Sequence, residues 1–157
     1  MKNILKGLVL CVFTFCLLTG CGNEIVRVEG NLVDLMSNVY ANISEEELPM
    51  MLESRTLADD EIEYFIGTKD IKYKEVVASE SGIGSIAHSV VLIRMQEDAT
   101  EEDIENAKKL IKEKADPRKW MCVEAENVFV ESNGDLILLV MSDAKANTIK
   151  DNFLNLK

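Results

Sequence analysis

The sequence is poor in the residues that catalysis and metal binding use most often. It has a single histidine, His88, and four cysteines, three of which lie within the first 21 residues. A zinc site with two histidines is therefore excluded. An internal disulfide framework is excluded after residue 21, because only Cys122 follows. We expect no cofactor and no metal site, so the stability of the fold has to come from an apolar core.

Basic residues are also scarce relative to acidic ones. The chain has 17 Lys and Arg residues against 28 Asp and Glu residues, a formal net charge of −11. Binding to nucleic acid requires clustered Lys and Arg side chains that neutralise phosphates, so we expect no nucleic-acid partner. An anionic lipid leaflet repels an acidic domain, so charge alone would not hold this domain on a membrane.

The first 20 residues combine a basic head with a short apolar run. Lys2 and Lys6 precede residues 7–18, in which Thr14 is the only polar side chain. A run of about a dozen residues is too short for a membrane-spanning helix, which needs about 20, and is typical of a secretory signal. We therefore predict that residues 1–20 are a signal peptide.

The stretch Leu18-Thr19-Gly20-Cys21, which ends this run, resembles the lipobox of bacterial lipoproteins. In that family the cysteine thiol receives a diacylglyceryl group, and a peptidase then cuts before the modified residue. The resemblance implies both events for Cys21. The lipid bilayer is then a partner through the acylated Cys21, and the protein is expected on the extracytoplasmic face of the cell membrane. The alternatives are an uncleaved anchor and an ordinary secreted product.

The chain after the predicted signal peptide is long enough for one domain. Residues 1–20 contain two lysines and no acid, so the remaining 137 residues carry 15 basic and 28 acidic side chains, a formal charge of −13. A chain of this length buries about two-thirds of its unfolded surface. We predict a lipid-anchored tether at residues 21–30 and a single domain at residues 31–157.

Apolar periodicity predicts an α+β fold for this domain. Helical spacing begins at Leu32, a capping box lies at Ser44–Glu47, and a short helix over residues 58–66 ends at Gly67. After residue 70 the expected order is ββαββα. The expected strands lie near residues 71–74, 90–93, 127–131 and 135–141, and the expected helices begin at Thr100 and Asp143.

Four strands in this order can form an antiparallel sheet, and one solution is a circular permutation of the ferredoxin-like arrangement. That topology places the unbroken apolar runs VVLI (90–93) and LILLVM (136–141) in the centre of the sheet. The alternating stretch Ile71–Lys74 is expected at an edge. Two helices would cover one face of the sheet, and the N-terminal helices would cover the other.

Several short stretches of the domain match one family. They are AHSVVLIR at 87–94, Pro117, ENVFV at 126–130, Gly134 and Ser142-Asp143. On these residues and on the order of elements, residues from about 31 to 156 resemble the bacterial lipoproteins of the domain of unknown function 4358 family. Family members tend to have an acid where His88-Ser89 stand, so a role for that acid would not carry over. The resemblance implies a secreted, lipid-anchored α+β domain and no particular activity.

The candidate functional residues have simple structural interpretations beside the functional ones. His88 is expected at a strand end with a structural or solvent role, because it has no second ligand or catalytic neighbour. Cys122 is expected to be a small buried residue at a strand start. Trp120 is a possible partner contact, and the alternative is that it packs over the sheet edge. The acidic clusters at 59–63 and 97–103 lack a calcium-loop pattern and are expected to be solvated helix faces.

These observations favour a non-enzymatic binding or scaffolding module. Its partner would be an envelope protein or peptide. The alternative is an enzyme that acts on envelope material through carboxylates whose pairing only the fold would reveal.

Overall fold

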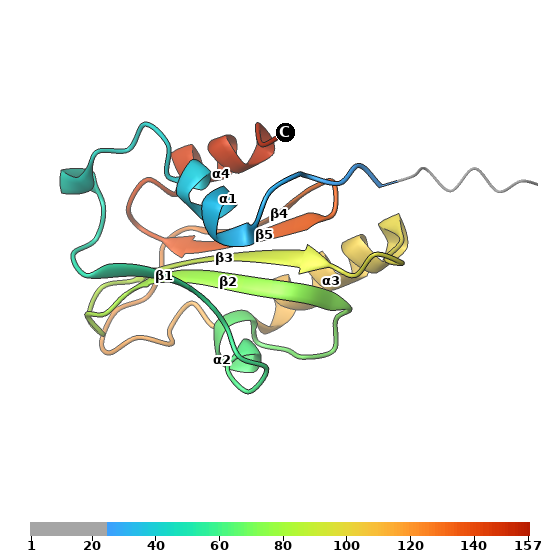
Figure 1. The fold of residues 1–157 in the computed structure, drawn as a ribbon. Helices are drawn as coiled ribbons and strands as arrows, with labels where there is room; N and C mark the ends of the chain where they lie inside the picture. The colour runs from blue at the N-terminus through green and yellow to red at the C-terminus, as the bar shows by residue number, and fades with distance from the viewer. Residues whose placement is uncertain (1–24) are drawn as a thin grey trace, which may run out of the picture.

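A computed structural model describes residues 25–157, and their sheet lies between two layers of helices (Figure 1). The elements in chain order are α1 (Leu32–Val39), the short 3-10 helix η1 (Glu45–Glu47), β1 (Leu52–Thr56), α2 (Ile62–Ile66), β2 (Tyr73–Ser81), β3 (His88–Met95), α3 (Glu101–Lys114), β4 (Val128–Asn133), β5 (Leu136–Ser142) and α4 (Ala146–Leu154). The α+β class predicted from the sequence is confirmed.

The five strands form one antiparallel sheet in the order β1-β2-β3-β5-β4. β3 and β5, which contain the apolar runs VVLI and LILLVM, both lie inside the sheet, as expected. Every residue of β5 is buried, and so is every residue of β3 except Arg94. Strands that are apolar on both sides need cover on both faces of the sheet, and this requirement sets the layered arrangement.

The expected number of four strands is wrong, because β1 adds a fifth. β1 has the sequence LESRT, with one apolar residue; Leu52 is half-buried and the other four residues are exposed. It pairs with the far half of β2, from Leu52 opposite Ser81 to Thr56 opposite Val77. β2, the strand that Ile71–Lys74 leads into, lies between β1 and β3 and is not an edge strand as a whole. β1 ends opposite Val77, however, so Tyr73 and Lys74 have a neighbouring strand only on the β3 side.

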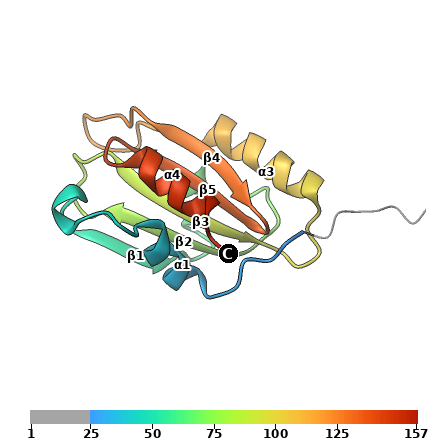
Figure 2. The ribbon, with the colours of Figure 1, turned by 90° about the horizontal axis from the view of Figure 1, so that it is seen from above.

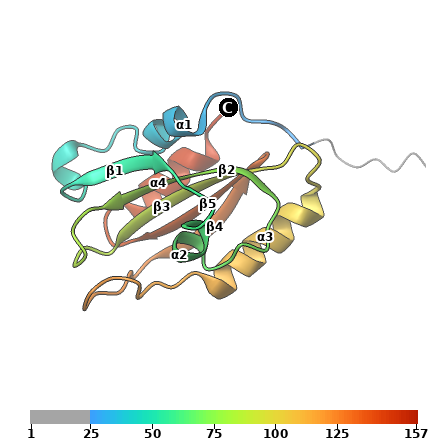
Figure 3. The same ribbon diagram turned by 60° about the horizontal axis from the view of Figure 1, so that its bottom comes forward.

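The helices also cover the sheet differently from the expected arrangement (Figures 2 and 3). α2 and α3 pack on one face, where the core contains Val91, Ile93 and Leu139. α1 and α4 pack on the other, over Val90, Leu92 and Leu138. α1, with eight residues, and α2, with five, lie on opposite faces. α3, with 14 residues, and α4, with nine, also lie on opposite faces, whereas a ferredoxin-like fold has both of its helices on the same face.

Some helix ends follow the local signals, but α4 begins at Ala146 rather than at Asp143, and α2 begins at Ile62 rather than at residue 58. Thr100 caps α3 and forms a capping box with Asp103, and Ser44 forms one with Glu47. α2 ends at Gly67, whose φ is +78° and where a Cβ atom would lie 2.1 Å from the carbonyl oxygen of Lys114. Only glycine fits both the backbone conformation and the close approach.

Within residues 25–157, no helix has the length and apolar character needed to cross a bilayer. The predicted signal peptide and Cys21 lie outside the described residues.

Candidate functional site

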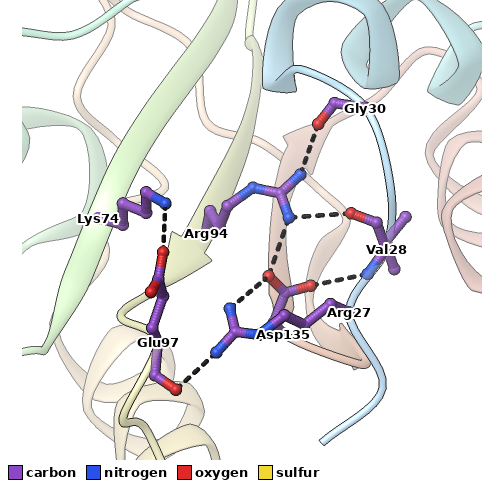
Figure 4. A network of polar contacts seen from close by, with 7 residues as sticks. All are labelled: Arg27, Val28, Gly30, Lys74, Arg94, Glu97 and Asp135. Carbon is purple, nitrogen blue, oxygen red and sulfur yellow. Dashed lines mark hydrogen bonds and ion pairs between the residues drawn. The ribbon is translucent and has the colours of Figure 1, made fainter.

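Residues Ile25–Gly30, which precede α1, are held against the end of the sheet by a buried carboxylate (Figure 4). The side chain of Asp135, which is 2% exposed, accepts a hydrogen bond from the backbone N–H of Val28 at 3.0 Å. Its other oxygen lies 2.8 Å from Nη1 of Arg94 and 3.6 Å from Nη1 of Arg27. Asp135 thus binds both a backbone donor and two guanidinium groups.

Arg94 completes this arrangement by binding the backbone of the same segment. Its Nη1 donates to the carbonyl oxygen of Val28 and its Nη2 donates to that of Gly30, both at 2.9 Å. Arg94 lies near the end of β3, and Asp135 immediately precedes β5, so two interior strands position the pair. We call Arg27, Val28, Gly30, Arg94 and Asp135 the N-terminal clasp.

The turn between β4 and β5 is shaped to receive the segment. The backbone N–H of Asp135 donates to the carbonyl oxygen of Val26 at 3.0 Å. Gly134 has a φ of +55°, and a Cβ atom there would lie 2.1 Å from that same oxygen. The Asn-Gly pair therefore serves both the hairpin and the close approach of the N-terminal segment.

A second layer of charged groups surrounds the clasp. Nη2 of Arg27 donates to the carbonyl oxygen of Glu97 at 2.5 Å, and the carboxylate of Glu97 pairs with Lys74 at 2.8 Å. Lys74 is the main cause of the lowered pKa of Glu97. In the same acidic cluster, Asp103 binds Thr100 and has a lowered pKa for that reason. Part of the cluster at 97–103 is therefore engaged in ion pairs and a helix cap.

A second buried charge lies at the other end of the sheet. Lys119, in the irregular segment after α3, has a side chain that is only 4% exposed. Its Nζ lies 2.8 Å from the carboxylate of Glu80 and donates to the hydroxyl of Ser89 at 3.1 Å. Burial lowers the pKa of Lys119, and the neighbouring Glu80 opposes this shift.

Three aromatic rings enclose the same ammonium group. Nζ of Lys119 lies 4.4 Å from the ring centroid of Phe65, 4.7 Å from that of Tyr64 and 5.3 Å from that of Trp120. These distances allow cation–π attraction. We call Tyr64, Phe65, Glu80, Ser89, Lys119 and Trp120 the lysine box.

Trp120 belongs to this box. It is 9% exposed, and its Nε1–H donates to the carboxylate of Glu80 at 3.1 Å. The packing interpretation fits this position, and a partner could reach only the margin of the ring. The adjacent Met121 is 72% exposed and its backbone N–H donates to the carbonyl oxygen of Gly84. The lysine box therefore fixes a loop that presents Met121 rather than Trp120.

His88 lies inside a short chain of hydrogen bonds. It is fully buried, with Nε2 3.0 Å from the hydroxyl of Tyr40 and Nδ1 2.7 Å from the hydroxyl of Ser142. Ser142 also donates to the carbonyl oxygen of Ala144, so a neutral His88 can donate from Nδ1 and accept at Nε2. Burial lowers the pKa of His88 to about 4. The imidazole joins β3, β5 and the end of α1.

The expectation that Cys122 is buried at a strand start is wrong. Cys122 is exposed, has a φ of +63°, and lies six residues before β4 begins at Val128. The stretch between Pro117 and Val128 is a loop held by Lys119 and by the N–H of Ala125, which donates to the carbonyl oxygen of Pro117.

The acidic side chains of residues 25–157 form no group of three or more potential ligands that could hold a metal ion. Glu61 of the cluster at 59–63 pairs with Arg55 at 2.6 Å, which lowers its pKa to about 2. Glu53 and Glu80 line a small cavity of about 160 Å³ beside Arg55 and Phe65. A wider cleft of about 600 Å³ lies between residues 25–26, α3 and the β4–β5 turn.

Sequence reasoning missed the two central residues of these sites. Asp135 was placed only as the first residue of the expected strand at 135–141, and Lys119 was not singled out. The one available sign of the lysine box in the sequence was that Lys119 directly precedes Trp120, the only tryptophan.

No family model, curated protein or solved structure matches this chain. The resemblance to the domain of unknown function 4358 family and the lipobox resemblance stay predictions.

Proposed function

We propose that this chain is a lipid-anchored binding or scaffolding module, not an enzyme, on the extracytoplasmic face of a cell membrane. The N-terminal clasp supports this proposal. If Cys21 carries the lipid, only residues 22–24 separate it from Ile25, where the described segment begins to follow the domain. Four residue steps span at most about 14 Å, so the domain would stay close to the bilayer, with its clasp end toward it.

One observation carries the non-enzymatic interpretation: the buried charged groups of residues 25–157 bind other parts of the same chain. Asp135 and Arg94 bind backbone groups of the N-terminal segment, and Lys119 and Glu80 bind each other and fix a loop. His88 joins three elements through neutral hydrogen bonds. A catalytic group needs a free side in a cavity that substrate can enter. Glu80 lines the small cavity beside Arg55, but its carboxylate is bound by Lys119 and Trp120. The other groups hold chain segments in place.

The partner surface is proposed at the end of the sheet opposite the clasp. β3 runs from His88 at that end to Met95 beside Asp135, so the loops before β3 lie away from Ile25 (Figure 1). Met51, which is 71% exposed, accepts a hydrogen bond from Gly82, and Gly84 accepts one from Met121. Two exposed methionines therefore flank the turn at 82–84. Methionine side chains adapt to varied apolar partners.

The anchoring part of the proposal is tested by Cys21→Ser. This variant should take up no labelled fatty acid and should keep its signal peptide, because the thiol that receives the lipid is gone. Labelled fatty acid that still entered the variant would overturn the proposal that Cys21 is the lipid site.

The binding part is tested by in-situ crosslinking of the anchored protein. A photoreactive residue at Met121 should crosslink to an envelope protein or peptide, and the same residue at Asp98, beside the clasp, is the matched control. Crosslinks that form at Asp98 and not at Met121 would contradict a partner surface at the end opposite the clasp.

A further inference from the structure

β1 leaves one side of its backbone open. Met51 and Leu57 are hydrogen bonded to β2, through the pairs Gly82 N–H to Met51 oxygen and Leu57 N–H to Val76 oxygen, both 2.9 Å. Alternate residues of an antiparallel strand face opposite edges, so Glu53 and Arg55 also point their backbone groups toward β2. The backbone N–H and C=O groups of Leu52, Ser54 and Thr56 consequently point away from the sheet.

This edge has neither lysine nor proline. Natural edge strands are commonly protected by short length, charged side chains, proline, a bulge or a covering segment. The five residues of β1 include two charges, but these have opposite signs and do not repel a strand with the complementary pattern. β1 has the sequence LESRT, and its residues from Glu53 to Thr56 are all exposed. Figure 2 shows β1 at the margin of the sheet. The open groups of Leu52, Ser54 and Thr56 can therefore pair with another strand.

The charges of β1 select a particular partner. An antiparallel copy of β1 with Ser54 opposite itself places Leu52 opposite Thr56 and Glu53 opposite Arg55 on both sides of the two-fold axis. Glu53 and Arg55 then form non-hydrogen-bonded pairs, in which Cα atoms are about 4.5 Å apart and side chains come closest. Opposite charges directly across two strands stabilise the pairing.

The neighbouring registers are disfavoured by the same charges. A two-fold axis at Glu53 places two glutamates opposite each other, and an axis at Arg55 places two arginines opposite each other. Shifting the register by one residue would place a residue whose backbone groups point away from the sheet opposite one whose backbone groups already pair with β2. The register centred on Ser54 is thus the one in which all five residues of β1 pair and every charge meets its opposite.

The intramolecular contacts leave room for this pairing. Glu53 forms no ion pair within residues 25–157, whereas Arg55 uses Nη1 and Nη2 on Glu61. The Nε–H of Arg55 is left for a second carboxylate. Both Glu53 and Arg55 lie on the face that carries Phe65 and Ala78, so the pairs of the two copies would share one side of the joined sheet.

The proposed pairing is limited to the five residues of β1. Met50 and Met51, which precede β1, are 68% and 71% exposed. Met51 has a φ of +55° and lies in a turn, so the two methionines do not extend the strand.

From these observations we propose that two copies of this chain associate through β1 in antiparallel register about Ser54, joining their sheets into one of ten strands. The occupant of the edge is a second copy, because the charge pattern of β1 is complementary to itself.

The proximity test uses a cysteine at the two-fold axis. In a hydrogen-bonded pair the two Cα atoms of position 54 are about 5.5 Å apart, within the range that a disulfide spans. The full chain with Ser54→Cys in a Cys122→Ser background, kept in mild detergent, should form a covalent dimer on oxidation. Ser132→Cys, a serine on the opposite edge strand β4, is the matched control and should form none.

The charge test uses variants in separate and mixed samples. Glu53→Arg should weaken association about tenfold or more in sedimentation, because two favourable pairs become two repulsive ones. Arg55→Glu should do the same. Mixing the two variants should restore the dimer, since each arginine then faces a glutamate.

Restoration in the mixture cannot arise from a folding defect of either variant, because it requires both chains to be folded and in contact. Failure of the mixture to dimerise while both variants keep the wild-type melting temperature would overturn the proposal. So would Ser54→Cys crosslinking to another protein instead of to itself, which would make β1 the docking edge for a foreign strand.

Discussion

The two ends of the sheet hold an irregular segment by opposite means. At the clasp, a buried acid and a guanidinium bind mainly the backbone of residues 28 and 30. At the lysine box, a buried ammonium is held by one carboxylate, one hydroxyl and three rings. The clasp therefore depends on Asp135 and Arg94 and little on the side chains of the bound segment. The box depends on the identity of Lys119 itself.

The comparison predicts that the clasp is the more costly of the two to break. Asp135→Ala leaves Arg94, whose side chain is 12% exposed, without its carboxylate, and removes the acceptor of the Val28 N–H. Removing one partner of a buried pair costs about 3–5 kcal/mol. We expect a loss of that size in urea unfolding, together with trypsin cleavage after Arg27.

Asp98→Ala is the control for this variant, because Asp98 is an exposed acid in the loop beside the clasp. It should change the free energy of unfolding by less than about 0.5 kcal/mol. Similar losses in the two variants would mean that the clasp contributes no more than an ordinary surface charge.

Lowering the pH should first weaken the end of the sheet that contains the lysine box, because His88 lies at that end. The folded pKa of His88 is about 4, below the ordinary 6.5, so the folded state disfavours the protonated ring. The stability that comes from a neutral His88 is complete above pH 6.5 and is lost as the pH falls toward 4. A difference of about 2.5 pKa units corresponds to about 3 kcal/mol.

This pH dependence is measured by urea unfolding of the wild type and of His88→Gln at pH 7 and pH 4. Carboxylates titrate in both proteins, so the difference between the two pH profiles isolates the imidazole. His88→Gln should lose about 3 kcal/mol less than the wild type over this range. Parallel profiles would show that His88 is not the group that acid protonates on unfolding.

The lysine box should be less costly to break than the clasp. Lys119→Met keeps an apolar side chain among the three rings and leaves Glu80, which is 19% exposed and still accepts from Trp120. Because solvent can reach this carboxylate, the cost should be about 2 kcal/mol, below the range for a fully buried pair. Trp120 is the only tryptophan, so its fluorescence during unfolding reports on the box directly.

Two further variants sharpen this prediction. The double variant Lys119→Met/Glu80→Gln should recover part of the loss, because no unpaired charge is left. Arg118→Met is the matched control, since Arg118 is 74% exposed and pairs only with the exposed Glu124. If Arg118→Met destabilised the protein as much as Lys119→Met, burial of the ammonium would not be the cause.

The parts of the fold that the sequence predicted are those that local patterns determine. The capping box at Thr100–Asp103, the Asn-Gly turn and the apolar run of β5 each depend on residues close together in the chain. β1 could not be predicted in this way. LESRT has no apolar alternation, and this stretch is a strand only because β2 lies beside it.

The candidate sites were less accessible to sequence reasoning for the same reason. A charged residue in a turn or loop is usually solvated, and Asp135 and Lys119 are exceptions because distant segments cover them. Asp135 meets Val28, 107 positions away, and Lys119 meets Glu80 of β2 from the loop after α3. His88 lies at a strand end, as expected, although its partners Tyr40 and Ser142 could not be identified from the pattern.

The smallest effect is expected at Cys122, in the loop that the lysine box holds. Because the thiol is exposed, Cys122→Ala removes no buried group. The backbone φ of +63° strains alanine as much as cysteine, so this strain also cancels between the two proteins. The free energy of unfolding should therefore change by less than about 0.5 kcal/mol, and partner crosslinking from Met121 should persist. A thiol-reactive dye should label the folded wild type at once at this position. Slow labelling, or a loss of more than about 1 kcal/mol in Cys122→Ala, would mean that the loop closes over the thiol and that the box fixes it less firmly than Lys119 and Glu80 indicate.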